Sequence, residues 1–512
     1  MTPGHDPTRP LRRGVYVLLI ALAVGDMTGR LLAVNSVSRI ELEQFLVSQQ
    51  VAALQRQWRA EGADAAEIAA RTAEARPRIE AAERRQRPFL SANDRSRWLT
   101  IRALSEHATY AIDEVIDVHV WNTIDMVQHK GRDGLKHLYS SKPPLLATLL
   151  TIEYLAIRHT IGWTLADNPY EVARLMLLTV NVLPTILMLA LVARWVERYG
   201  RTDWGRVLTV AAAAFGTMLS AFIVVLNNHT IAAVSTAIAL DAVLRIWCDG
   251  DRRIRWYAVA GGFAAFAAAD ELPALSLLAL VAAALLWDDW RRWLIGFVPA
   301  AAVVVAAFFG TNYAAHQSWR PPYMHRHDSN PLDDDPEDNW YAYAYTLDGK
   351  ERRSYWLDPQ GIDRGEPSKW TYALHDLVGH HAVLSLTPLW LLSLWGAWIW
   401  LSGDDARQRQ VAAGIALVTV VCVVFYVGLR PQQERTCGGM TSGFRWLFWQ
   451  APLWLLLMLP AADRAARSRW GMAAACTLLA WSVMSASYPT WNPWTQPWIY
   501  NWLESSGWRP SF

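Results

Sequence analysis

The sequence predicts an all-α polytopic membrane protein, a transmembrane helical bundle of about 11–13 spans with large, partly helical outward loops. Hydrophobic residues make up 53% of the 512 residues, and they are gathered into long blocks. The longest blocks, at ~20 residues, can each cross the ~30 Å hydrocarbon core of a bilayer as a helix. The blocks lie at residues 15–34, 172–192, 207–226, 230–246, 257–269, 272–287, 294–313, 382–401, 411–429, 447–460 and 471–488.

Charged residues set the orientation of these spans. The formal net charge is only +2, which is not the strongly basic balance of a nucleic-acid-binding protein, so no nucleic-acid partner is expected. Because Lys and Arg concentrate in cytoplasmic loops, their clusters predict a cytoplasmic N-terminus and long polar loops outside. The arginine clusters lie at the N-terminus and at residues 194–206, 252–255, 291–292, 407–409 and 464–469.

Two apolar segments need separate interpretation. The first apolar run follows three arginines, as in a signal peptide, but it is long and no small-residue cleavage site stands out, so an uncleaved first span is preferred. Residues 143–163 include Glu153, Arg158 and His159, which are costly in hydrocarbon. We therefore expect a partly inserted or interfacial helix in this second segment.

The alternation of apolar and polar segments divides the chain into five regions. Residues 1–35 form the cytoplasmic N-terminus and first span, and residues 36–141 form a first outward loop. Residues 142–313 form a transmembrane core, residues 314–380 a second outward loop, and residues 381–512 the last spans and an outward tail.

Within the first loop, residues 38–87 are rich in Ala, Glu, Gln and Arg and break once, at a glycine. They predict a helical hairpin arm. One face of the arm carries apolar residues, and its expected role is packing or binding a partner protein. These apolar residues are Leu42, Phe45, Leu46 and Leu54.

Two polar motifs follow the arm: Asn93-Asp94-Arg95-Ser96-Arg97-Trp98, and Ser140-Ser141-Lys142-Pro143-Pro144-Leu145 at the membrane boundary. Asp94 is the candidate general base, and the alternative is a helix N-cap or an ion pair with a neighbouring arginine. Lys142, held by two prolines, is suited to bind a phosphate as a point charge. The alternative for Lys142 is a lysine that snorkels to the interface.

Further candidates lie in the later outward turns. Arg445 follows a glycine-rich turn whose backbone N–H groups favour an anion; the alternative is an ordinary turn between a loop and a span. Arg95 is a further candidate for binding a phosphate together with Lys142. His229 is either a ligand or a solvated capping residue. Asp270 and Glu271 are expected to line a polar cavity, since two acids at membrane depth are costly elsewhere.

No residue is predicted as a metal ligand. His316, His325, His327 and Asp328 are near one another in the second loop, but their spacing fits no compact metal motif. A divalent cation is therefore only a candidate cofactor. The four cysteines show no metal spacing either, and they are interpreted as small buried apolar residues.

These motifs, in this order, resemble the GT-C superfamily of membrane glycosyltransferases, which includes protein O-mannosyltransferases and aminoarabinose transferases acting on lipid A. The resemblance rests on the acid of the first loop, Asp94, on the turn of Lys142-Pro143-Pro144-Leu145, and on the later turn from Gly438 to Arg445. It covers about residues 10–320 and, separately, that later turn.

The resemblance implies transfer of a sugar from a polyprenyl-phosphate donor to a lipid, glycan or protein acceptor at the outward face of a bacterial inner membrane. Asp94 would then activate the acceptor hydroxyl, while Lys142, Arg445 and Arg95 would bind the donor phosphate. Two alternatives remain open: a transporter or flippase of a lipid-linked or polar substrate, and a non-catalytic subunit of a membrane complex. Transporters usually show internal duplication, and none is visible in the sequence.

Overall fold

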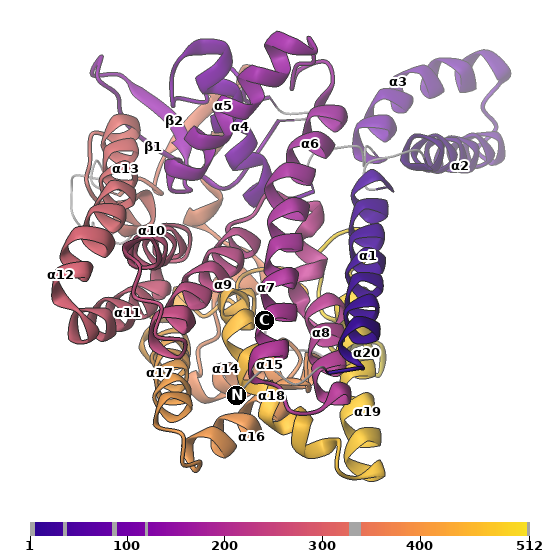
Figure 1. Cartoon of the computed structure of the whole chain (residues 1–512). Helices are drawn as coiled ribbons and strands as arrows, with labels where there is room; N and C mark the ends of the chain where they lie inside the picture. Colours follow the sequence, from indigo (N-terminus) through magenta and orange to yellow (C-terminus); the bar gives the residue numbers. More distant parts are fainter. Residues whose placement is uncertain (1–5, 34–37, 84–89, 118–120, 327–338, 509–512) are drawn as a thin grey trace.

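The computed structural model confirms the all-α fold class, with 71% of the chain helical and 4% in strands. It describes residues 6–33, 38–83, 90–117, 121–326 and 339–508, and the side chains of residues 38–45 and 81 are not described. Helices make up the body, several of them roughly parallel and others crossing them, and a helical hairpin projects from one end of it (Figure 1).

Seven helical segments among the described residues are long and apolar enough to cross a membrane. Two more, Leu272–Asp288 and Trp390–Leu401, are apolar but shorter. Seven is below the 11–13 spans expected, because several of the apolar runs form helices of only 12–17 residues. The seven are α1 (Arg9–Ala33), Pro169–Tyr199 (α6, η1 and α7), Asp203–Val224 (α8 and η2), α9 (Asn228–Trp247), Trp290–His316 (α12, η4 and α13), Ala406–Leu429 (α17 and η9) and α19 (Arg469–Ser487).

The centre of the bundle is built around α18 (Ala451–Ala465), which is buried on nearly all sides. A helix that is apolar all round belongs in such a core. Helix α16 (Trp390–Leu401) approaches it so closely that a Cβ on Gly396 would lie 1.8 Å from the Leu457 carbonyl oxygen. The other neighbours of α18 in the core are α7 (Leu183–Tyr199), α8 (Asp203–Phe215) and α9, and α10 (Ile254–Asp270) packs in turn on α9.

The first loop continues into α4 (Ala92–His107), whose N-terminus is capped by Ser91, and then into an antiparallel hairpin of β1 (Met126–Lys130) and β2 (Lys136–Ser140). Helix α5 (Pro144–Thr160) starts directly after the Lys-Pro pair, with proline at its first position. Its 17 residues are too few for the seven spans. This length agrees with the expected short helix, and its depth in a membrane stays a prediction.

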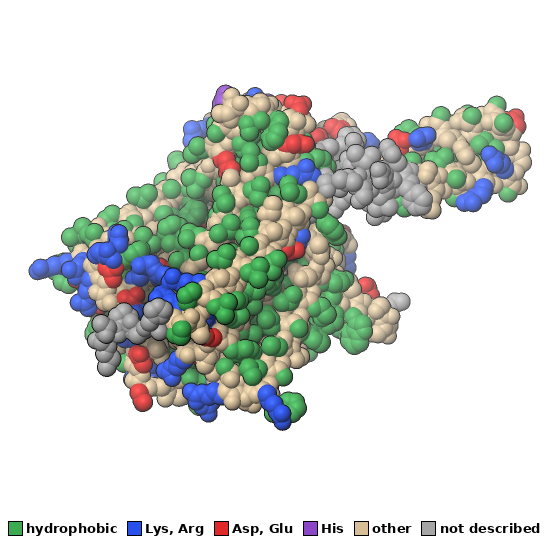
Figure 2. Space-filling view, turned by 45° about the vertical axis from the view of Figure 1, so that its right-hand side comes forward, with side chains coloured by type: hydrophobic (Ala, Val, Ile, Leu, Met, Phe, Trp, Pro, Cys, Tyr) green, Lys and Arg blue, Asp and Glu red, His purple; other side chains and the backbone are tan. Residues whose placement is uncertain are grey.

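The hairpin arm is confirmed as two helices, α2 (Ser38–Ala60) and α3 (Ala65–Glu83), which break at Gly62. Figures 1 and 2 show the arm standing away from the body. Leu46 and Leu54 are half-buried, whereas the side chains of Leu42 and Phe45 lie outside the described residues. A partner protein for the arm stays a prediction.

The second loop and the C-terminal region supply short elements around the bundle. In the second loop, β3 and β4 form a two-stranded hairpin. The remaining elements are η3 (Leu272–Ala274), α11 (Leu275–Asp288), η5 (Pro322–His325), β3 (Ala344–Leu347), β4 (Lys350–Arg353), η7 (Tyr355–Leu357), η8 (Gly361–Arg364), α14 (Lys369–Leu377), α15 (Val383–Leu386), η10 (Gln432–Glu434), η11 (Arg445–Gln450) and α20 (Trp498–Ser505).

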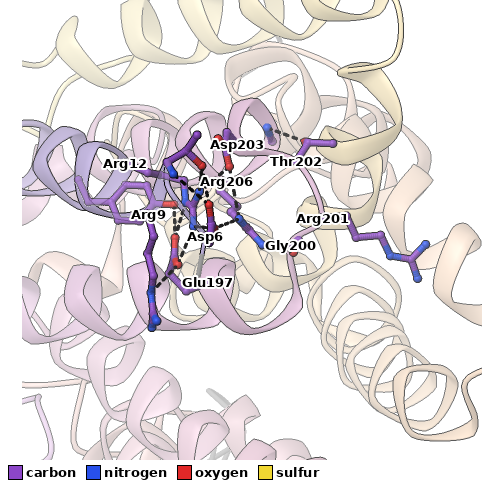
Figure 3. A network of polar contacts seen from close by, with 12 residues as sticks. Asp6, Arg9, Arg12, Glu197, Gly200, Arg201, Thr202, Asp203 and Arg206 are labelled. Atoms are coloured by element: carbon purple, nitrogen blue, oxygen red, sulfur yellow. Dashed lines mark hydrogen bonds and ion pairs between the residues drawn. The ribbon is translucent and has the colours of Figure 1, made fainter. Parts of the chain in front are cut away.

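The start of α1 is fastened to α7 and α8 by a network of ion pairs (Figure 3). The guanidinium of Arg12 is 3% exposed and donates to both carboxylate oxygens of Glu197, at 2.6 and 2.9 Å. It also contacts Asp203 at 2.5 Å and Asp6 at 2.9 Å. The planar guanidinium is therefore required for its geometry as well as its charge.

Replacing Arg12 with Ala is expected to lower the free energy of unfolding by about 3 kcal/mol, because it removes the buried guanidinium that pairs with Glu197, Asp203 and Asp6 at once. Arg12→Lys should recover only part of the loss, since an ammonium cannot form the paired contact with one carboxylate. The measurement is the thermal midpoint in detergent. Arg9, which is mostly exposed and 3.6 Å from the same Glu197, provides the control. If Arg9→Ala costs as much as Arg12→Ala, the network does not act through burial.

Candidate functional site

A cavity of about 960 Å³ lies where the first loop, the second loop and the outer ends of several helices meet. Its wall draws on α4, the Lys-Pro-Pro turn, the start of α9, the junction of α10 with η3, and the turn before η11. Six cationic and five acidic side chains line it, which is a high charge density beside a largely apolar bundle. They are Arg95, Arg97, Lys142, Arg326, Arg430 and Arg445, with Asp125, Asp270, Glu271, Asp363 and Glu434.

Six of the seven residues singled out in the sequence line this one cavity, although they come from distant parts of the chain. They are Arg95, Lys142, His229, Asp270, Glu271 and Arg445. The seventh, Asp94, is not among the lining residues.

Asp94 is 2% exposed and serves the packing of α4. Its Oδ1 atom accepts a hydrogen bond from the indole of Trp98 and another from the backbone N–H of Leu226, both at 2.9 Å. Burial raises the pKa of its carboxyl to about 6, and the two donors oppose that shift. The geometry therefore departs from the expectation of an acid that meets the acceptor, because internal donors occupy this carboxylate.

The acid that faces Lys142 is Asp125, which the sequence analysis did not single out. Asp125 Oδ1 lies 3.0 Å from Lys142 Nζ. The Asp125 carbonyl accepts from the Ser96 hydroxyl at 2.6 Å and from the Ser141 N–H at 3.1 Å. Asp125 is thus fixed to α4 and to the Lys-Pro-Pro turn. Its 17-residue separation from Lys142 gives no local pattern, and only its place in the same polar loop could have indicated it.

Lys142 is held at the floor of the cavity. Its backbone N–H donates to the Ser140 hydroxyl at 3.1 Å, and that hydroxyl also bonds to Ser96 at 2.6 Å. Burial lowers the pKa of the Lys142 ammonium, whereas Asp125 counteracts the shift. A partly buried ammonium with one carboxylate partner can bind an anionic ligand, which replaces the hydration that the ammonium has lost.

A second cation, Arg445, is oriented by two side chains in series, His229 and Glu271. Arg445 donates to His229 Nε2 at 3.0 Å, and His229 Nδ1 contacts the Glu271 carboxylate. Since Arg445 only donates, Nε2 must be the acceptor and Nδ1 must carry the proton. Burial lowers the pKa of Arg445 to about 10, so it is cationic at neutral pH.

The glycine-rich turn also positions Arg445. Its Nε donates to the Gly438 carbonyl at 2.8 Å. Gly438 has φ +96°, and a Cβ there would lie 3.0 Å from the Arg445 Nε. Glycine is therefore needed both for the left-handed backbone and for the close approach.

The Glu271 carboxylate reaches a third cation through Asn228. Asn228 donates to Glu271 Oε1 at 2.8 Å and accepts from Arg97 at 2.8 Å. One buried carboxylate thus orients two cavity arginines, Arg445 and Arg97, through neutral side chains. Asp270, beside it, has a buried carboxylate oxygen with no partner among the described residues.

The described residues contain no group of three or more His, Cys, Asp or Glu side chains arranged to hold a metal ion. His316 bonds to His129 at 3.0 Å, and His325 stacks on Trp340 with ring centres 3.7 Å apart. His327 and Asp328 lie outside the described residues. A divalent cation at this cluster stays a prediction.

No protein-family model matches the sequence, and no curated protein matches it. Among solved structures, the chain is similar to the oligosaccharyltransferase of Archaeoglobus fulgidus in its apo form, with a TM-score of 0.40 and 11% sequence identity. The similarity covers 82% of this chain and 54% of that one, so the chain spans about half the length of that protein. A likeness this distant carries no inference about activity.

The position of Asp94 predicts a pH-dependent stability. Because its pKa in the fold is about 6, above the usual value of 3.8, the wild type loses stability as the pH rises from about 4 through 6. Asp94→Asn keeps an oxygen for Trp98 and Leu226 without this loss. Its thermal midpoint should therefore rise relative to the wild type between pH 4 and pH 7.

Asp94→Ala is the control for this comparison. It leaves both N–H donors unpaired at every pH, at a cost of about 1–3 kcal/mol each. A difference between Asp94→Asn and wild type that does not change with pH would contradict the assignment of Asp94 to the buried framework.

Proposed function

We propose that the protein is a glycosyltransferase of the GT-C type, moving a sugar from a polyprenyl-phosphate-linked donor to an acceptor hydroxyl at the outward membrane face. One observation carries the proposal: two partly buried cations from distant segments, Lys142 and Arg445, line the same cavity as the Asp125 carboxylate, beside helices suited to a membrane. Transfer of a sugar from a lipid phosphate to a hydroxyl requires cations that bind the phosphate and a carboxylate that takes the proton of the hydroxyl.

In the proposed mechanism the carboxylate of Asp125 takes the proton of the acceptor hydroxyl. The hydroxyl oxygen forms a bond to the anomeric carbon of the donor sugar as the bond from that carbon to the phosphate oxygen breaks, with inversion. The bonding electron pair leaves with the polyprenyl phosphate, so no strong acid is needed for departure. Lys142 and Arg445, supported by Arg95 and Arg97, stabilise the charge that grows on the phosphate.

Before the donor binds, Asp125 and Lys142 neutralise each other across 3.0 Å. A phosphate that takes over Lys142 releases the Asp125 carboxylate for the acceptor hydroxyl. Arg95 is a weaker candidate for direct contact, because its Nε already donates to the Asn122 carbonyl at 2.5 Å. We assign Asp94 the role of fixing α4, from which Arg95 and Arg97 project.

Substitution of the two acids separates their roles. Asp125→Asn should lower transfer by ~10²–10⁴-fold, the usual contribution of a general base, without weakening donor binding, because it removes only the carboxylate that competes with the phosphate for Lys142. Asp94→Asn, which keeps its internal bonds, should lower transfer much less. The assay is purified protein in lipid with a polyprenyl-phosphate sugar, reading product formation and donor affinity separately. The reverse ranking would return the base to Asp94, the acid expected from the sequence.

Lys142→Ala serves as the contrast, because it removes a contact to a phosphate that is charged before and after transfer. It should weaken donor binding as well as turnover.

Intact donor binding with no transfer by the wild type would favour a transporter or a non-catalytic subunit.

The role of His229 predicts that two similar amide substitutions have unequal effects on donor affinity. In His229→Gln, the amide oxygen can occupy the place of Nε2 and accept from Arg445, whereas His229→Asn reaches only the place of Nδ1. We expect Gln to retain donor affinity to within a few-fold, and Asn to weaken it by ~10-fold, the scale of one charge-assisted hydrogen bond. Equal losses would indicate that His229 only packs the start of α9.

A further inference from the structure

Arg326 differs from the other cationic side chains of the cavity in its partners. Lys142 pairs with Asp125 and Arg430 with Glu434 at 2.8 Å. Arg445, Arg97 and Arg95 donate to neutral acceptors on His229, Asn228 and Asn122. Within the described ranges, Arg326 has neither a carboxylate partner nor a hydrogen bond. Its guanidinium instead lies 4.4 Å from the ring centre of Trp356 and 5.8 Å from that of Tyr341.

The surface that holds Arg326 adjoins the proposed base. The Trp356 indole donates to the carbonyl of Ile124, the residue before Asp125, at 2.9 Å. Trp356, Tyr341 and Arg326 all line the cavity. An acceptor whose hydroxyl reaches Asp125 therefore lies beside two aromatic rings and a guanidinium that forms no ion pair among the described residues, although the Asp363 carboxylate of the same cavity lies within range of its charge.

This guanidinium is oriented for a ligand. Its contacts with the rings of Trp356 and Tyr341 restrict the guanidinium before a ligand binds, so it loses less freedom on binding than a fully exposed arginine would. A planar guanidinium with free N–H groups matches a carboxylate or a phosphate through two parallel hydrogen bonds. The donor phosphate is already provided for by Lys142 and Arg445, so Arg326 serves a second anionic group.

From this arrangement, and resting on the proposed glycosyl transfer, we infer that the acceptor is an anionic glycan: a sugar that stacks against the aromatic pair and carries a carboxylate or phosphate bound by Arg326. The inference narrows the acceptor from any lipid, glycan or protein to a class with negative charge next to the reacting hydroxyl.

The test compares three glycosides that share one ring: methyl β-glucoside, methyl β-glucuronide and methyl β-glucoside 6-phosphate. Binding is measured on the full-length protein in detergent by saturation-transfer NMR. Saturating geranyl phosphate is present throughout, to occupy Lys142 and Arg445. We expect at least one anionic glycoside to bind ~10-fold more tightly than the neutral one, through its charge-assisted hydrogen bonds. The stronger of the two identifies the anionic group as carboxylate or phosphate.

Arg326→Gln should abolish this preference while leaving the affinity for geranyl phosphate unchanged. Arg430→Gln is the matched control, because Arg430 also lies over aromatic rings in the same cavity, 4.3 Å from Trp446, but is paired with Glu434. It should keep the preference. Arg326→Lys, which retains charge without the planar fork, should keep only part of it.

Equal binding of all three glycosides by the wild type would overturn the inference, and so would a preference that survives Arg326→Gln. Failure of the proposed function looks different. In that case no polyprenyl-phosphate sugar supports transfer, while the preference for an anionic glycoside still depends on Arg326.

Discussion

The ion pair between Lys142 and Asp125 is the contact around which the polar end of the molecule is organised. It joins the turn that begins α5 to the segment before β1, and two serine hydroxyls, on Ser96 and Ser140, secure both to α4. A charge buried at the edge of an apolar bundle is stable only when it is paired and hydrogen-bonded. The fold therefore holds an acid and a base together in the position where a charged ligand can replace one partner.

The need to pair or hydrogen-bond a charge at the edge of an apolar bundle also explains how the other cationic side chains of the cavity are positioned. Glu271 lies between two arginines and contacts neither directly, because Asn228 and His229 relay its effect. A direct salt bridge would neutralise an arginine, whereas a neutral intermediary orients it and leaves its charge available. Arg12, in contrast, is surrounded by Glu197, Asp203 and Asp6 at the start of α1, and these ion pairs neutralise its charge.

The sequence predicted those features that depend on local pattern. Long apolar runs gave the fold class, the glycine break gave the arm of α2 and α3, and the Lys-Pro-Pro turn gave the start of α5. Asp125 was missed because its partner is not near in sequence, and Asp94 was favoured because it is the acid of the motif that precedes the Lys-Pro-Pro turn in the first loop. The donor that occupies Asp94, the backbone N–H of Leu226, is 132 residues away. Among the described residues, fewer helices are long enough to cross a membrane than the apolar runs suggested, because hydropathy alone does not determine where a helix begins and ends.

A comparison of Arg326 with Arg430 shows that residue type alone does not identify a binding residue. Both are arginines of one cavity, and both lie over aromatic rings at nearly the same distance, 4.4 and 4.3 Å. Arg430 has Glu434 four residues further along the chain, a spacing that makes the ion pair local and largely independent of any ligand. Arg326 forms no ion pair among the described residues: Trp356 and Tyr341 lie against its guanidinium, and Asp363 acts on its charge only at a distance. What distinguishes a binding arginine from a structural one is therefore the neighbour it lacks, and that is a property of the folded chain.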